Sequence, residues 1–137
     1  MKNYNKINKY YLDLLMKGQK VHWDYNGLES GYLLTDSYIL SCVPSMYLNK
    51  DIMLKANLEK FLELPYEDYK QISMLVHIPE TKTIALLNNE IHVTVEINKK
   101  YYNLYKGCTF KILSDIKPVL VYDKENLVAF ILPIKRY

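Results

Sequence analysis

Residues 118–137 read PVLVYDKENLVAFILPIKRY, and this stretch indicates the fold most clearly. Two apolar runs, 119–121 and 127–134, flank a polar bend of four residues, DKEN. Runs of β-branched and aromatic residues on both sides of such a bend are typical of an antiparallel pair of strands. Chain termini usually fray, so an apolar strand this close to the end of the sequence raises the question of what it packs against.

Similar short segments recur upstream and are expected to form further strands. Residues 21–25 alternate apolar and polar side chains with the period of two that a half-buried strand has. Asn26-Gly27 follows, a dipeptide typical of a tight hairpin turn because both residues tolerate positive φ, and 31–35 is predicted to be the return strand. The other predicted strands are residues 38–43, 74–78, 83–87, 91–97, 109–113, 119–122 and 127–134.

Three segments have features of helices. In residues 4–16 the apolar side chains recur every three or four positions, and Gly18 suits a C-cap. Residues 54–64 also place their apolar side chains on one side, directly before a proline. A short helix is predicted at residues 98–105.

The length and composition suit one globular domain over residues 1–137, with an α+β fold of mainly antiparallel sheet and two or three helices on one face. No apolar run approaches the roughly 18 residues that a membrane span needs, so no membrane association is expected. The first ten residues, MKNYNKINKY, lack the apolar segment of a secretory signal. Cys42 and Cys108 form no CxxC pair, so two reduced thiols and a cytoplasmic location are expected.

The residue types that most often carry catalysis or bind metals form no recognisable motif. The histidines His22, His77 and His92 are scattered over predicted strands without the spacing of metal ligands. The sequence has neither a nucleophile elbow nor a glycine-rich phosphate loop. We therefore expect a protein that is not an enzyme and that holds no metal or cofactor. The alternative is an enzyme whose site assembles in space from His22 and Asp24 with a distant histidine.

Lysines are concentrated near the start of the sequence. The net charge of +3 is too small to indicate nucleic-acid binding by itself. However, the first predicted helix and the residues after it carry several lysines, which are suited to phosphate contacts, and a tyrosine suited to stacking. The residues expected to bind nucleic acid in that case are Lys6, Lys9, Tyr10, Lys17 and Lys20. The alternative is a solvated helix face.

Three segments precede the carboxyl-terminal stretch in a characteristic order: LLTDSYILSCVP (33–44), LKANLEKFLEL (54–64) and VEINKKYYNLYK (95–106). In this order they resemble the domains of bacterial DNA sliding clamps, the polymerase processivity factors. The first is similar to a strand–turn–strand segment of those domains, and the second to the helix that follows it. The third, together with 118–137, is similar to the closing helix, charged turn and terminal strand. The resemblance covers most of the chain and implies a sliding-clamp-domain-like fold.

In sliding clamps the tail after the terminal strand lines an apolar groove that receives peptide motifs from polymerases. The resemblance therefore implies a partner-binding surface made by Pro133, Ile134, Arg136 and Tyr137. The alternative is an edge strand with a short charged tail that discourages aggregation.

From these features we expect a non-catalytic interaction protein in nucleic-acid transactions. Lys, Asn, Ile and Tyr have AT-rich codons, and their abundance suggests an AT-rich bacterium or its phage. The expected role is a phage-encoded modulator or inhibitor whose protein partner is a polymerase-type enzyme or a defence nuclease. The fourteen tyrosines favour such a contact surface. The alternative is an oligomeric DNA-binding replication accessory factor. A clamp subunit carries three such domains, so a ring of single domains needs a larger homo-oligomer.

Overall fold

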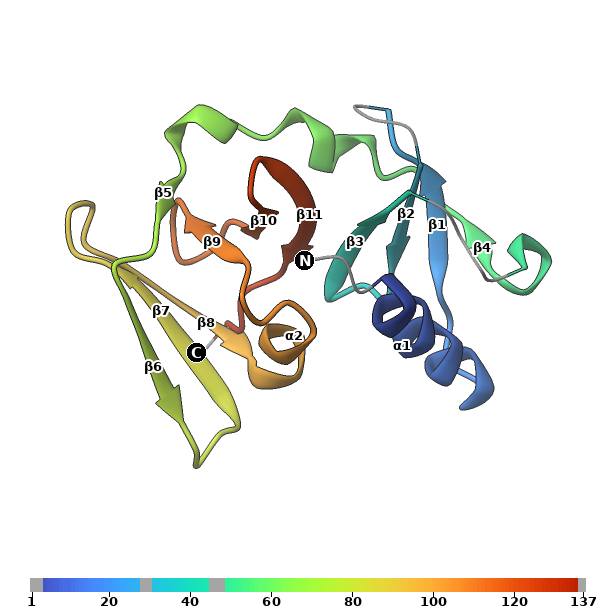
Figure 1. The fold of residues 1–137 in the computed structure, drawn as a ribbon, viewed down its shortest axis with the longest axis horizontal. Helices are drawn as coiled ribbons and strands as arrows, with labels where there is room; N and C mark the ends of the chain where they lie inside the picture. Colours follow the sequence, from blue (N-terminus) through green and yellow to red (C-terminus); the bar gives the residue numbers. More distant parts are fainter. Residues whose placement is uncertain (1–3, 28–30, 45–48, 136–137) are drawn as a thin grey trace. The chain divides into compact units, whose positions relative to one another are not determined.

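The computed structural model describes residues 4–27, 31–44 and 49–135. The chain divides into two compact units, which we call the amino-terminal unit (Lys2–Leu64) and the carboxyl-terminal unit (Pro65–Tyr137, with Met1). Both units combine a mainly antiparallel sheet with one α-helix, so the expected α+β class is confirmed (Figure 1). The expectation of one domain over residues 1–137 stays a prediction.

In its described residues, the amino-terminal unit has one α-helix and four strands. Its strands lie in the order β4-β1-β2-β3, with β1/β2 and β2/β3 antiparallel and β4 parallel to β1. The elements are α1 (Tyr4–Met16), β1 (His22–Tyr25), β2 (Tyr32–Thr35), β3 (Ile39–Val43), β4 (Leu54–Lys55) and the 3-10 turns η1 (Lys50–Ile52) and η2 (Glu59–Glu63). The predicted strands in 21–25, 31–35 and 38–43 are therefore confirmed.

Helix α1 is held to this sheet by its apolar face and by one tyrosine. Ile7, Tyr11 and Leu14 are buried, as their spacing predicts. The Tyr11 hydroxyl donates a hydrogen bond of 3.0 Å to the backbone oxygen of Leu34. Gly18 ends the helix with a φ of 78°, which is the left-handed conformation that favours glycine, so the predicted C-cap is confirmed.

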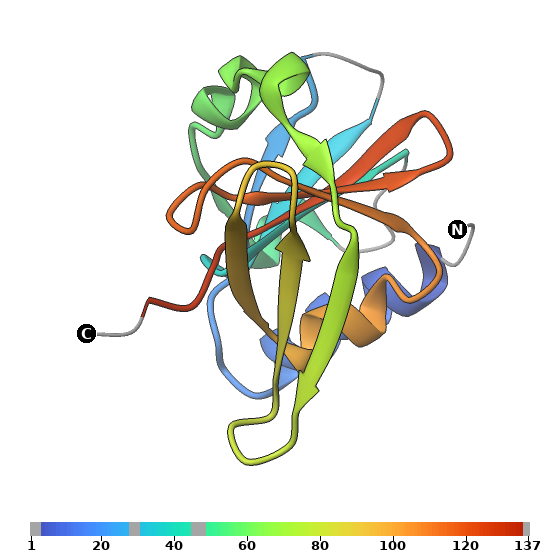
Figure 2. The ribbon, with the colours of Figure 1, turned by 90° about the vertical axis from the view of Figure 1, so that its left-hand side faces the viewer.

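The carboxyl-terminal unit has two groups of strands, both antiparallel. One has the order β5-β9-β10-β11, and the other is the meander β6-β7-β8 (Figures 1 and 2). The elements are η3 (Tyr66–Asp68), β5 (Lys70–Gln71), β6 (Met74–Ile78), β7 (Thr83–Asn88), β8 (Val93–Asn98), α2 (Lys99–Leu104), β9 (Thr109–Ile112), β10 (Val119–Asp123) and β11 (Asn126–Ile131). The predicted strands and the short helix of this half are confirmed within a few residues.

The apolar terminal stretch is a sheet member whose side chains are buried. Strand β11 pairs with β10, and residues 119–121 and 128–131 are all buried. The strand ends at Ile131, earlier than the predicted 134, because Pro133 has no backbone N–H to donate to a ladder. Beyond the proline, the Ile134 amide donates a hydrogen bond of 2.8 Å to the backbone oxygen of Glu96 on β8.

The prediction of an α-helix at residues 54–64 is wrong. Its first residues form β4, whose Leu54 amide donates to Val21 and whose neighbour Ala56 donates to Trp23, each at 3.0 Å. The Leu58 amide, which a helix would have used internally, instead donates to the Asp24 carboxylate at 2.9 Å. Tertiary hydrogen bonds thus override the helical pattern of the leucines.

Two further sequence predictions concern turns and helices. The Asn26-Gly27 pair does not take positive φ; Gly31, at the start of the return strand, does, with a φ of 126°. In the described residues the α-helices are α1 and α2, one in each unit, rather than three. That the helices lie on one common face stays a prediction.

Candidate binding site

Three aromatic rings from β1 and β2 come together with two lysines on the amino-terminal unit. Trp23 and Tyr25 are two residues apart on β1, which places them on one side of the strand. Tyr25 is paired across strands with Tyr32 of β2. We call the five residues Trp23, Tyr25, Tyr32, Lys50 and Lys55 the aromatic–lysine cluster.

Trp23 and Tyr25 pack edge to face, and Tyr25 and Tyr32 pack with their rings tilted. The Trp23 and Tyr25 centroids are 5.1 Å apart at an interplanar angle of 83°, and those of Tyr25 and Tyr32 are 5.8 Å apart at 38°. Trp23 is nearly buried, whereas Tyr25 is 57% exposed. The cluster therefore has a buried indole base and an open tyrosine edge, an arrangement typical of contact surfaces.

Both lysines place their ammonium groups over these rings. The Lys50 Nζ atom lies 4.8 Å from the Trp23 centroid, 5.1 Å from Tyr25 and 4.8 Å from Tyr32. The Lys55 Nζ atom lies 5.4 Å from Trp23 and 5.8 Å from Tyr25. These distances are within the range of cation–π attraction. The two positive charges are thus held at fixed positions beside an exposed ring.

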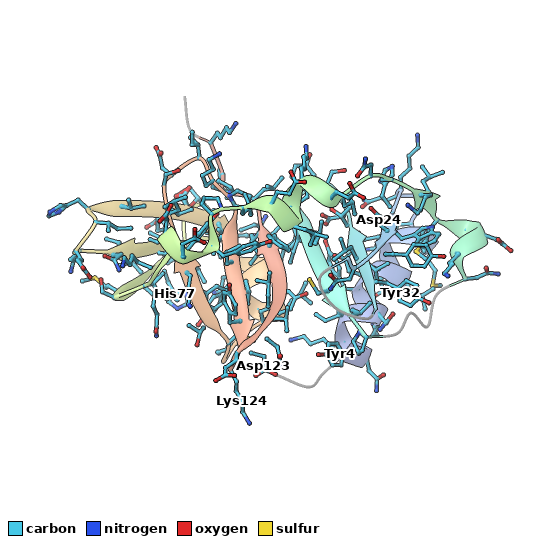
Figure 3. All side chains as sticks on the ribbon, turned by 90° about the horizontal axis from the view of Figure 1, so that it is seen from above. Tyr4, Asp24, Tyr32, His77, Asp123 and Lys124 are labelled. Carbon is cyan, nitrogen blue, oxygen red and sulfur yellow. The ribbon has the colours of Figure 1, made fainter. Side chains whose placement is uncertain are left out.

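Asp24 fixes the segment that carries Lys55. Its carboxylate accepts hydrogen bonds from the Lys55 ammonium at 2.7 Å, the Tyr25 amide at 2.8 Å and the Leu58 amide at 2.9 Å. Burial raises the pKa of Asp24, but these hydrogen bonds favour the charged form more strongly and hold the pKa below 3.8, its ordinary value. The side chain is therefore a carboxylate at neutral pH, and its charge is already paired with that of Lys55. Figure 3 labels Asp24 and Tyr32 on the amino-terminal unit.

Lys50 has no such partner in the part of the chain that the structure describes. There, no carboxylate lies within 4.0 Å of its ammonium, whose contacts are with the three rings. Ile52 and Leu54, which follow it along the chain, are exposed apolar residues. The neighbourhood of Lys50 thus combines an unneutralised cation with exposed apolar surface.

No protein-family model, curated protein or solved structure matches this chain. The evidence on function is therefore the chemistry of the aromatic–lysine cluster, of the predicted nucleic-acid site near α1 and of the predicted partner-binding tail.

The residues predicted to bind nucleic acid lie on α1 or just after it. Lys6, Lys9, Lys17 and Lys20 are exposed. Lys9 forms an ion pair of 3.0 Å with Asp13. Tyr10 is half-buried, and its hydroxyl donates to the Asp36 carboxylate, so part of its surface already serves the fold. Nucleic-acid binding by these residues stays a prediction.

The residues predicted to form a partner-binding groove are described only in part. Pro133 and Ile134 are half-buried, and Ile134 is attached to β8 through its backbone. Arg136 and Tyr137 lie outside the described residues. This site too stays a prediction.

Of the residues considered for catalysis or metal binding, His22 and Asp24 lie on the same strand, β1. In the described ranges no three His, Cys, Asp or Glu side chains gather into a group that could hold a metal ion. His77 contacts the Tyr102 ring edge to face at 6.1 Å. No described helix is long and apolar enough to cross a membrane.

Strand β6 is a second exposed surface, on the carboxyl-terminal unit. It pairs with β7 along one edge and, among the described strands, with no other (Figure 2). Met74 and Val76 are exposed, and the strand sequence MLVHI has no lysine, acidic residue or proline of the kind that protects an edge. Such a strand is open to pairing with another chain.

Sequence reasoning found two of the five residues of the aromatic–lysine cluster, Trp23 and Tyr25. The alternation of Val21, Trp23 and Tyr25 indicates that the two rings share one side of a strand. Lys50 lies in a stretch without periodicity, and Lys55 was placed on a helix that does not form. The Asn49 side chain, which accepts a hydrogen bond of 2.9 Å from the Asp51 amide, is the local signal for the turn that carries Lys50.

Proposed function

We propose that this chain is a non-catalytic interaction protein in nucleic-acid transactions: a phage-encoded modulator or inhibitor of a DNA-processing or defence enzyme. The observation that supports the proposal is the aromatic–lysine cluster, in which rigid rings and two cations are presented together at the surface. Aromatic residues anchored in a well-packed base dominate the binding energy of many protein interfaces.

The charges of the cluster favour an acidic surface on the partner. Asp24 neutralises Lys55, while Lys50 has no carboxylate neighbour among the described residues. An acidic patch on the partner would complement Lys50, and such complementary potential contributes to both encounter rate and specificity. Exposed Ile52 and Leu54 supply apolar area beside the charges.

The likeness to a sliding-clamp domain belongs to this proposal as well. The mainly antiparallel sheets with one α-helix in each unit support it. Residues 54–64 argue against that part of the resemblance, because they contain a short strand and a 3-10 turn in place of the expected helix. A partner surface at Pro133, Ile134, Arg136 and Tyr137 rests on the resemblance alone.

The proposal is tested by affinity capture of DNA-processing enzymes with three versions of the full chain. The wild type, the double variant Tyr25→Ala/Lys50→Ala and the matched control Tyr38→Ala are compared, since Tyr38 is an equally exposed tyrosine elsewhere on the same unit. We expect the wild type and the control to retain a polymerase-type enzyme or nuclease that the double variant loses. A partner retained by the double variant but lost after truncation beyond Leu132 would move the site to the carboxyl-terminal tail. Failure of the wild type to retain any such enzyme would contradict the proposal.

A second candidate function is direct DNA binding by an oligomer through α1. The exposed lysines of that helix favour it. It predicts an affinity for duplex DNA that falls steeply with salt, and loss of this binding when Lys6, Lys9 and Lys17 are neutralised together. Unchanged binding after this triple substitution would contradict it.

A further inference from the structure

We infer that the aromatic–lysine cluster is a contact site for single-stranded nucleic acid. In this arrangement a base stacks on the exposed ring of Tyr25, and a flanking phosphate pairs with Lys50, whereas the charge of Lys55 is already paired with Asp24. The inference goes beyond the proposed function and rests on the same site: it adds a nucleic-acid ligand to the protein partner proposed for the cluster.

The first step is the sign of the charge that the site accepts. Lys50 Nζ lies within about 5 Å of all three rings, and Lys55 Nζ is also close to two of them. The space over the rings is therefore already positive, and an external cation would be repelled from it. An anionic ligand, by contrast, gains the charge of Lys50, which no described carboxylate neutralises.

The second step is the flat apolar surface beside those charges. Tyr25 is 57% exposed, although its ring edge is supported by buried Trp23. An exposed ring on a rigid base is the usual platform for an unpaired base, because every base has a face that can stack. Phosphate groups and bases are neighbours along a single strand, and Lys50 and the exposed Tyr25 ring are neighbours in the cluster.

The third step separates single strands from the other anionic ligands. In a duplex the base faces are covered by their neighbours, so only the phosphates remain for contact with the cluster, at Lys50. An acidic peptide supplies negative charge but no ring to stack on Tyr25. The cluster has a cation for a phosphate and an exposed ring for a base within one patch. This favours a ligand that carries phosphates and unpaired bases together.

The chain contains a single tryptophan, and it is the base of this cluster. Trp23 emission therefore reports on the site directly. We expect oligodeoxythymidylate and oligouridylate to change this emission saturably, whereas a duplex of equal length and poly-glutamate bind at least about tenfold more weakly. The two single-stranded probes distinguish DNA from RNA as the source of the ligand. Equal binding of poly-glutamate, or no saturable change with either single strand, would overturn the inference.

Variants locate the contact. Loss of one stacking platform weakens affinity by about 5- to 150-fold, or ~1–3 kcal/mol, so Tyr25→Ala is expected to bind oligodeoxythymidylate weaker by a factor in this range. Tyr25→Phe keeps the ring and is expected to bind like the wild type, as is the exposed-tyrosine control Tyr38→Ala. If Tyr25→Ala and Tyr38→Ala bind alike in anisotropy titrations with a labelled oligonucleotide, the inference is wrong.

The salt dependence tests the lysines. For single strands, each neutralised phosphate contributes about −0.7 to the slope of log affinity against log salt. Lys50→Gln is therefore expected to make the slope of log affinity against log salt shallower by about 0.7. Lys17→Gln, which changes a residue just after α1, is expected to leave this slope unchanged. The opposite pattern would assign the contact to the region of α1 and overturn the inference. Loss of oligonucleotide binding with enzyme capture intact would leave the proposed function standing, so the two failures are distinguishable.

Discussion

Replacing Asp24 with alanine is expected to destabilise the amino-terminal unit more than any other removal of a single carboxylate among its described residues. Asp24 is 8% exposed, and its two oxygens accept hydrogen bonds from one ammonium and two backbone amides. Without the Asp24 carboxylate, the buried Leu58 amide has no acceptor, and the segment that carries Lys55 loses its side-chain attachment to β1.

The magnitude follows from these contacts. A buried donor without an acceptor costs ~1–3 kcal/mol. The Lys55 side chain is 50% exposed, so solvent screening limits its ion pair to about 1 kcal/mol or less. Together we expect Asp24→Ala to lower the free energy of unfolding by ~2–3 kcal/mol. Asp24→Asn is expected to cost ~1–2 kcal/mol, because its amide group presents a donor where one of the present donors needs an acceptor.

The assay is urea unfolding followed by Trp23 emission, with Asp13→Ala as the matched control. Asp13 forms an exposed i,i+4 ion pair with Lys9, which is worth ~0.5 kcal/mol or less. Because the pKa of Asp24 is lowered in the folded state, its contribution is complete above pH 3.8 and is lost as the pH falls through the folded value. Asp24→Asn should lack this acid dependence. Equal midpoints for Asp24→Ala and Asp13→Ala would refute the reasoning.

Three further predictions concern other positions. Gly31→Ala is expected to cost at least ~2 kcal/mol in urea unfolding, because the residue has a φ of 126° and its new Cβ would meet a backbone oxygen at 2.4 Å. The control Gly27→Ala, whose Cβ meets only a leucine methyl at 3.4 Å, should be nearly neutral. Burial and the nearby charge of another tyrosine raise the pKa of Tyr69 to about 12. The contribution of Tyr69 to the free energy of unfolding should therefore be complete below pH 10 and decline as the pH rises through 12. Tyr69→Phe should remove this pH dependence. Val76→Lys on the edge strand β6 should leave the free energy of unfolding within ~0.5 kcal/mol of the wild-type value and should slow aggregation, as followed by light scattering. Faster aggregation of this variant would contradict the edge-strand argument.

The strands could be predicted from sequence because their patterns are local. The apolar runs 119–121 and 127–134 flank a bend, and β10 and β11 form there as expected. Gly18 ends α1 because few other residues tolerate its φ of 78°. In each case the residues that fix the conformation are neighbours in the chain, so the sequence displays the cause directly.

The candidate site could not be predicted because distant residues assemble it. Residues 54–64 have a helical pattern, yet the edge of β1 and the Asp24 carboxylate capture their backbone amides. Those acceptors are about thirty residues away in the chain, and no periodicity records them. The position of Lys50 over the rings depends on the same pairing. The site was missed for the same physical reason that the helix was predicted wrongly.

The segment that supplies both cations is joined to β1 by a short parallel pairing, in which the amides of Leu54 and Ala56 donate hydrogen bonds to Val21 and Trp23. Short edge pairings of this kind open by local fluctuation long before a domain unfolds. Deuterium should therefore enter these two amides early, ahead of those of β2, which has partners on both sides. A nucleic-acid strand bound at Lys50 would hold the segment closed, so slower isotope uptake at these two amides would record occupancy of the site without any label on the ligand.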